Sequence, residues 1–297
     1  MTVRRLVTGV LIVLAATVQP LRAQESVGKR FFPDQLVIAE SFVEDELSLP
    51  SILSVKRGRS AGERSTRLTD FGGEIKKRIT ADFELSVGGG LALLEEKRGT
   101  RTGFENLNVG MKYEFFRNIP HEVVASLSLQ WELGDTGKAA IGAASFDTVS
   151  PSMLVGKGFG DLPERLAMLR PLAISGLFGF EIPVRDQPTA IAWGGVIEYS
   201  LPYLTEFVRD VGLPSAIKRL VPIVETDLRT DVAGRLAGRI RGTVNPGVIW
   251  VGDTLQIGIE AVAPIDPATG HGLGVRAFVR IPLEVLFGRR AGEPLFR

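Results

Sequence analysis

The sequence has no cysteine and only two histidines among its 297 residues. The absence of cysteine excludes disulfide bonds, thiol catalysis and thiolate-bound metals. His121 and His271 are too few for a histidine metal site, and neither has a nucleophile beside it on a predicted strand face, as serine–histidine catalysis requires. We therefore predict no enzymatic activity, no cofactor and no metal site.

Long apolar runs are equally scarce. After residue 23, no stretch is long and apolar enough to form a membrane-spanning helix. The one compact run, Leu6 to Val18, follows Arg4 and Arg5 and precedes Ala23, which is the pattern of a secretory signal peptide. We predict that residues 1–23 are removed on export; an uncleaved anchor helix is the alternative interpretation.

Neither sign of charge dominates the chain. Lysine and arginine together number 35 and aspartate and glutamate 34, so the composition indicates no nucleic-acid-binding surface. The glycine-rich run at 156–160 lacks the spacing and the following residues of a P-loop or a dinucleotide fingerprint. We expect a turn at this run and no nucleic-acid partner.

The sequence does contain strict alternation of apolar and polar residues. It is clearest in two runs joined by turn-forming residues at 116–120: Leu107, Val109, Met111, Tyr113 and Phe115, then Val123, Ala125, Leu127, Leu129 and Trp131. Alternation predicts strands, because successive side chains point to opposite faces. Each strand runs for roughly ten residues, beyond the soluble mode of about five to six and close to the roughly 9–11 that cross a bilayer.

The same pattern recurs about twelve times, which predicts a closed antiparallel up-and-down transmembrane β-barrel over residues 41–287. Only helices and closed barrels satisfy every backbone group in lipid, and an even strand number is usual for such barrels. Residues 24–40 are expected to form a lead-in, unstructured over 25–34, and residues 288–297 a tail. The predicted outer connections are 56–67, 95–102, 133–145, 184–188, 229–241 and 265–271. The predicted inner ones are 80–82, 116–121, 157–170, 202–219 and 252–253, the two long ones forming short helices or a plug.

The two strand faces differ in a way that favours a membrane barrel. The apolar faces carry aromatic residues near strand ends, which suits the level of lipid headgroups. The opposite faces carry both signs of charge, which suits a wet lumen better than an apolar ligand cavity. A secreted sandwich or a lipid-binding barrel is the alternative. The residues that we expect to face the lumen are Glu74, Lys76, Arg78, Glu84, Lys112, Glu114, Glu122, Glu132, Glu198, Glu225, Glu260, Arg276, Arg280 and Glu284.

Several short stretches resemble the outer-membrane barrels of the MetA-pathway of phenol degradation family. They are FVEDE at 42–46 with SLPSIL after it, FENL at 104–107 running into GMKY at 110–113, SMLVGKGFGDLP at 152–163, PIVE at 222–225 and NPG at 245–247. The resemblance covers nearly the whole chain after residue 23, although the C-terminal residues depart from a common barrel ending. It implies an outer-membrane location and the passage of small, often aromatic or apolar, solutes, and it brings no residue-level site.

Two hypotheses follow for the function. The first is a porin-like transporter or channel of a Gram-negative outer membrane, whose lumen charges and loops recognise a small solute. The second is a structural outer-membrane barrel whose interior is filled with ion pairs and conducts nothing. Both predict contact with outer-membrane lipid and with the barrel assembly machinery during biogenesis. Glu225 and Asp227 lie close enough in sequence to bind a cation, but we interpret them as a solvated strand end.

Overall fold

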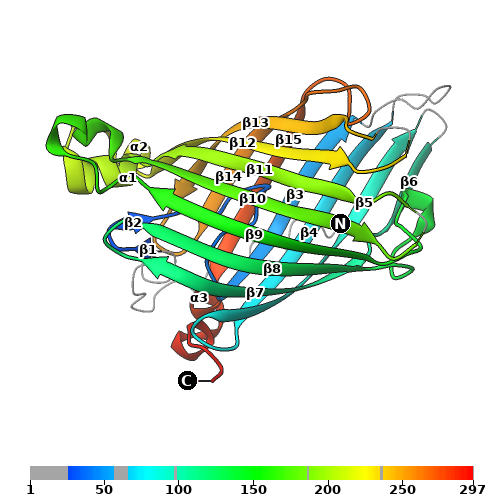
Figure 1. Cartoon of the computed structure of the whole chain (residues 1–297), viewed down its shortest axis with the longest axis horizontal. Coiled ribbons are helices and arrows are strands. Elements are labelled where there is room, and N and C mark those ends of the chain that lie inside the picture. The colour runs from blue at the N-terminus through cyan, green and yellow to red at the C-terminus, as the bar shows by residue number, and fades with distance from the viewer. Residues whose placement is uncertain (1–25, 57–65, 97–98, 186, 235–236, 297) are drawn as a thin grey trace, which may run out of the picture.

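A computed structural model of the chain describes residues 26–56, 66–96, 99–185, 187–234 and 237–296. In these residues, twelve long strands form one closed antiparallel sheet (Figure 1). They are β3 (Glu46–Lys56), β4 (Arg67–Arg78), β5 (Phe83–Glu96), β7 (Leu107–Asn118), β8 (Val123–Leu133), β9 (Thr148–Gly158), β10 (Leu172–Pro183), β11 (Ala190–Tyr199), β12 (Leu220–Asp231), β13 (Ile240–Val251), β14 (Gln256–Pro264) and β15 (Gly274–Pro282). Neighbours in sequence pair with each other, and β15 pairs with β3 to close the ring. The predicted barrel is confirmed; the predicted signal peptide lies outside the described residues.

The apolar faces of the strands point outward and the charged faces inward. On β7, Met111 and Tyr113 are 43% and 51% exposed, whereas Lys112 between them is buried. On β5, Leu85 and Val87 are exposed, whereas Glu84 is buried. Because side chains alternate along a strand, this arrangement repeats around the ring and gives the barrel an apolar exterior and a charged interior.

The connections divide the barrel into two ends, which we call the plug end and the loop end. At the plug end lie the short turns near residues 79–82, 119–122 and 252–255, and two longer connections. The longer ones contain η3 (Glu164–Leu169) and the group α1 (Leu201–Tyr203), η4 (Leu204–Val208) and α2 (Ser215–Lys218). The loop end carries the other connections, including η2 (Ala139–Ile141) and β6 (Gly99–Phe104). The connections therefore alternate between the two ends as predicted, and which end faces the outside of the cell stays a prediction.

Three predicted boundaries were wrong. Residues 95–102 are not simply a loop, because β6 pairs with the end of β5 there. The first barrel strand begins at Glu46 rather than near residue 41, and the last ends at Pro282 rather than near residue 287. After Pro282 come α3 (Leu283–Phe287) and η5 (Arg289–Gly292), so Glu284 belongs to a helix and not to the lumen wall. No helix in the described part of the chain is long and apolar enough to cross a membrane.

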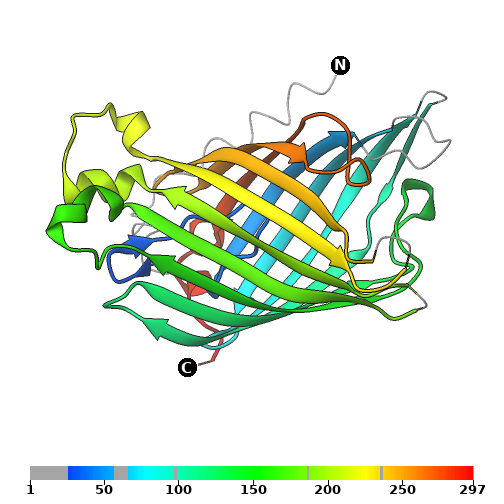
Figure 2. The same cartoon turned by 45° about the horizontal axis from the view of Figure 1, so that its top comes forward.

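Residues 24–40 were expected to be a lead-in, unstructured up to residue 34, and for the described residues this expectation was wrong. Residues 26–45, which we call the plug, lie inside the barrel and are mostly buried (Figure 2). The plug begins with a small hairpin of β1 (Ser26–Val27) and β2 (Arg30–Phe31), which turns at Gly28 with a φ of +66°. Its middle reaches into the lumen, and it returns to the plug end to enter β3. Its polar groups replace water as partners of the charged wall.

Candidate functional site in the lumen

The base of the plug is held by Arg30, which is fully buried. Its guanidinium donates hydrogen bonds to the carbonyl oxygens of Pro171, at 2.9 Å, in the connection between β9 and β10, and of Leu172, at 3.0 Å, at the start of β10. It also stacks over the Tyr203 ring, 4.1 Å from the centroid, and lies 3.5 Å from a carboxylate oxygen of Glu122. Both long connections at the plug end thus contact the buried Arg30 side chain.

The middle of the plug is held through its backbone by Glu225 on β12. Its carboxylate accepts hydrogen bonds from the backbone N–H groups of Leu36 and Val37, both at 2.8 Å, and of Ile38, at 3.3 Å. Nearby, the Gln256 amide donates to Asp34 at 2.6 Å. A carboxylate that accepts hydrogen bonds from several backbone N–H groups fixes the position of the chain, whatever side chains those residues carry.

On one side of the lumen, the plug packs against an apolar surface. Leu36 and Ile38 join inward-facing residues at the plug end of β11, β12, β13 and β15 in one buried cluster. The wall residues of this cluster, which we call the apolar wall, are Val196, Val221, Ile223, Ile249, Val251 and Phe278. This wall departs from the charged faces expected of a water-filled pore, and Leu36 and Ile38 shield it from water.

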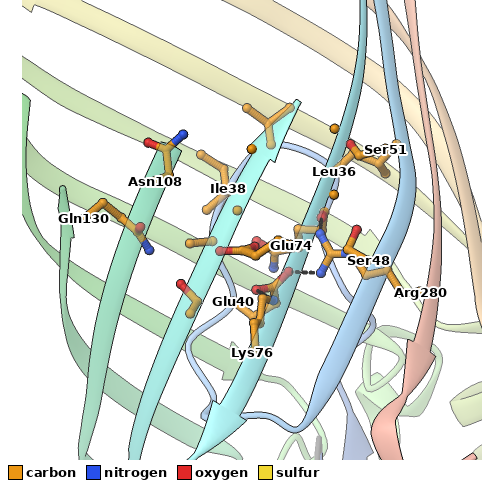
Figure 3. A pocket seen from close by; sticks show the side chains of 18 of the residues that line it. Leu36, Ile38, Glu40, Ser48, Ser51, Glu74, Lys76, Asn108, Gln130 and Arg280 are labelled. Carbon is orange, nitrogen blue, oxygen red and sulfur yellow. Dashed lines mark hydrogen bonds and ion pairs between the residues drawn. The ribbon is translucent and has the colours of Figure 1, made fainter. Parts of the chain in front are cut away.

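Three wall cations surround the returning arm of the plug, two of them on β4 and β7 and the third on β15 beside the apolar wall. The Lys76 ammonium lies 2.8 Å from Glu40 and 3.0 Å from Glu44, both on the plug. Arg280 binds Glu40 as well, as the dashed line in Figure 3 marks. Lys112 donates to the carbonyl oxygen of Phe42 at 2.6 Å. We call Lys76, Lys112 and Arg280 the cation cluster.

Carboxylates outnumber cations in this network. Asp34 lies 2.8 Å from Arg280, and the wall residues Glu46 and Glu84 lie 3.6 Å from Arg280 and 3.5 Å from Lys112. With Glu40 and Glu44 from the plug, five buried carboxylates therefore face three cations. Such an imbalance in a low-dielectric interior favours protonation of the acids that have the weakest partners.

The plug carboxylates respond differently to this environment. Burial alone would raise the pKa of Glu40, but Arg280, Lys76 and Lys112 hold it well below its usual range. Burial and the nearby Asp34 raise the pKa of Glu44 to about 8, against the pull of Lys76. Burial, assisted by Glu46, also raises the pKa of Asp34 well above its usual value. Of these three carboxylates, Glu40 is the one that the neighbouring cations keep ionised.

One group of carboxylates has a spacing that fits a metal ion. Oxygen atoms of Asp34, Glu44 and Glu46 lie within 4.8 Å of one another. Lys76 and Arg280 already stand beside these oxygens, however, and supply positive charge. We assign no metal to this group.

A cavity of about 350 Å³ lies beside the plug. Leu36, Ile38 and Glu40 of the plug line it together with Glu74 and Asn108 of the wall (Figure 3). Glycines on facing positions of β4 and β5 also line the cavity, and their lack of side chains leaves room there. The space has the volume of a small-molecule pocket.

The structure places the predicted lumen residues in three groups. Those that hold or adjoin the plug are Lys76, Arg78, Glu84, Lys112, Glu122, Glu225 and Arg280. Those that point inward and do not hold the plug within the described part of the chain are Glu74, Glu114, Glu132, Glu198, Glu260 and Arg276. Glu114 pairs with Arg117, Glu132 with Asn106, and Glu260 with Arg276. Glu284 lies outside the wall.

Sequence reasoning missed the plug residues Arg30, Asp34, Glu40 and Glu44. A signal was present, because residues 34–46 carry five acids among apolar residues, which is unusual for an unstructured lead-in. The chain was interpreted as lead-in and early strand because its pattern fits neither a helix nor a clean strand. Partners from distant strands explain these acids, and no local pattern reveals such partners.

Comparisons with known proteins give fold likenesses only. No family model matches the chain, and no curated protein matches it. Among solved structures, KdgM porin aligns with 79% of this chain and 98% of its own, at 11% identity and a TM-score of 0.46. NanC porin aligns with 78% and 98%, at 8% identity and 0.49. The translocator domain of autotransporter NalP from Neisseria meningitidis aligns with 80% and 86%, at 9% identity and 0.43. The chain is a plugged twelve-stranded barrel. Identities near one tenth do not extend the likeness to function.

Proposed function

We propose that the protein is a porin-like outer-membrane channel for small solutes and that its own N-terminal plug closes it. One observation carries the proposal: the ring of twelve strands is complete without the plug. The plug can therefore leave the lumen without breaking a hydrogen bond between barrel strands. The apolar exterior supports a membrane location, because exposed apolar side chains of this extent need lipid contact.

The finer parts of the proposal rest on sequence patterns. The signal-like residues 1–23 support export, and a barrel of this kind would reach the outer membrane through the barrel assembly machinery. The resemblance to the MetA-pathway family supports small aromatic or apolar solutes. No catalytic step is part of the proposal.

A second candidate function is a structural barrel that conducts nothing. The network of buried ion pairs between plug and wall favours it, since removing one partner from such a network is costly. The two candidates differ in one property, which is whether the plug ever leaves the lumen.

A reversible staple across the plug tests this difference. The side-chain oxygen of Ser41 lies 3.6 Å from the position that a Cβ on Gly156 would take, and the chain has no native cysteine. In the double variant Ser41→Cys/Gly156→Cys, the new thiols are placed to form a disulfide between plug and β9. Ion current through planar bilayers is then measured for the wild type and for the double variant, oxidised and reduced.

We expect low, flickering current from the wild type and from the reduced variant, and none from the oxidised variant. The single variant Ser41→Cys is the matched control and is expected to behave like the wild type under both redox conditions. Heat-modifiable gel migration confirms that each barrel is folded. A third protein lacks residues 26–44. If this chain, the wild type and the reduced variant are all folded and none gives current above background, the channel is refuted and the structural barrel remains.

A further inference from the structure

We infer that the plug occupies the binding site of a transported solute and imitates its chemistry: a small monocarboxylate with an apolar body. This inference rests on the proposed channel function and adds the solute class to it. It combines the cation cluster, the apolar wall and the contact that joins them.

The carboxylate half of the site is the place now taken by Glu40. Lys76 on β4 and Arg280 on β15 both bind this carboxylate, so two separate strands converge on one anion. The wall contributes all three cations of this region, and its carboxylates Glu46, Glu84 and Glu74 lie beside them or around the adjoining cavity. With the plug withdrawn, Lys76 and Arg280 lose the carboxylate that they share, so the carboxylate of a solute can take the place of Glu40.

The apolar half is the place now taken by Leu36 and Ile38. Both side chains are buried against the apolar wall, which includes Ile249 and Phe278. An empty lumen would expose this wall to water at a free-energy cost, because apolar surface is favoured out of water. A solute with an apolar body would cover the same surface.

Arg280 joins the two halves. Its guanidinium stacks over the Phe278 ring, 4.5 Å from the centroid, while it binds Glu40. A carboxylate on Arg280 therefore has an apolar surface directly beside it. On the plug, Ile38 and Glu40 are two residues apart, which is about 7 Å of extended chain. One small molecule can span that distance, and the adjoining cavity of about 350 Å³ gives it room to approach.

The experiment uses the full chain with the single substitution Ser41→Cys. Residue 41 is 3% exposed, so its thiol reacts with a maleimide only when the plug leaves the lumen. A solute that binds the vacated site shifts the population toward the open state and speeds labelling in proportion to its occupancy. The probes are benzoate, its neutral analogue benzamide, and acetate, which lacks the apolar body, all at equal concentration.

We expect benzoate to accelerate labelling by about fivefold or more, and benzamide and acetate by less than about twofold. Adding Arg280→Gln raises the basal rate and abolishes the benzoate effect, whereas the matched lumen variant Arg276→Gln retains it, because Arg276 pairs with Glu260. Equal acceleration by benzamide would exclude the carboxylate subsite, and equal acceleration by acetate would exclude the apolar one. Benzoate acceleration that survives Arg280→Gln would also overturn the inference.

The labelling experiment and the current measurement can fail independently of each other. Current from the reduced staple variant, together with no benzoate effect on labelling, overturns the solute class and leaves the channel standing. Benzoate-dependent labelling without any current supports the binding site and refutes passage of ions through the barrel.

Discussion

The two sides of the lumen hold the same plug by different physics. The apolar wall covers Leu36 and Ile38 as a soluble core would, with Val221 and Ile249 fully buried. The cation cluster holds the other arm through ion pairs, and water is not there to replace a partner that is lost. Apolar burial is non-directional and tolerates small shifts, whereas a buried charge that loses its partner is strongly destabilising. The apolar wall therefore stabilises the docked plug without fixing its exact place, and the cation cluster fixes that place.

The largest expected effect comes from removing one cation. Lys76→Met keeps the length of the side chain and leaves Glu40 and Glu44 short of a partner. Breaking such a buried pair costs about 3–5 kcal/mol, which corresponds to roughly a thousandfold increase in plug opening. The measurement is the maleimide labelling rate of Ser41→Cys in this background.

The matched control for that variant is Lys218→Met, whose ammonium pairs with the exposed Asp210 at 2.9 Å. Surface pairs contribute little, so its labelling rate should stay near that of the parent. If Lys76→Met labels no faster than Lys218→Met, the cation cluster does not position the plug.

The second effect probes the apolar wall. Ile38→Ala removes buried methyl groups that pack in the cluster with Val221 and Ile249. Such a truncation costs about 2–4 kcal/mol, so opening should increase by about a hundredfold, less than for Lys76→Met. If Ile38→Ala labels faster than Lys76→Met, the apolar wall contributes more to holding the plug than the cation cluster does, which contradicts this assignment.

Much of the fold was predictable because it depends on local alternation. Leu85 and Glu84, or Met111 and Lys112, take opposite faces simply because they are neighbours on a strand. The end of β15 was missed because Leu283, Val285 and Phe287 continue the apolar alternation into α3. Alternation alone cannot show where Pro282 ends the pairing.

The candidate site was predictable only in its wall. Lys76, Lys112 and Arg280 were expected to face the lumen from their strand positions. Their partners are on the plug, and Arg280 lies 240 positions from Glu40 in sequence. Residues so far apart in sequence come together only when the barrel closes. Alternation predicts which face of a strand a residue occupies, but it cannot predict where a segment that is not a strand lies against the wall.

The third effect uses pH to weaken the polar side alone. Glu44 has a pKa near 8 in the docked plug and an ordinary value near 4.5 when the plug is out. Docking therefore binds a proton, so it is strongest below about pH 4.5 and weakens as the pH rises through about 8. Asp34, whose pKa is also raised by burial, adds in the same direction. Glu40 opposes this only at lower pH, where its carboxylate would have to be protonated.

We therefore expect plug opening to increase by about tenfold or more between pH 6 and pH 8, and by at most about tenfold per pH unit for each proton bound. Labelling of Ser41→Cys is divided by that of Arg289→Cys, whose native side chain is 85% exposed, to remove the titration of the thiol itself. A ratio that is flat or falls with pH would contradict the protonated state of Glu44.

The smallest effect is expected at Glu225, which holds the plug through backbone N–H groups. The N–H of Leu36 donates to Oε1 of Glu225 and the N–H of Val37 to Oε2, so Glu225→Gln keeps an acceptor for only one of them and removes the negative charge. Since burial disfavours that charge, its loss offsets part of the weaker hydrogen bonding, and the net cost should be about 1 kcal/mol. Labelling should then rise by about fivefold. An increase as large as that of Ile38→Ala would mean that the backbone contacts, rather than the two side-chain surfaces, set the position of the plug, and the contrast between the two sides of the lumen would lose its physical basis.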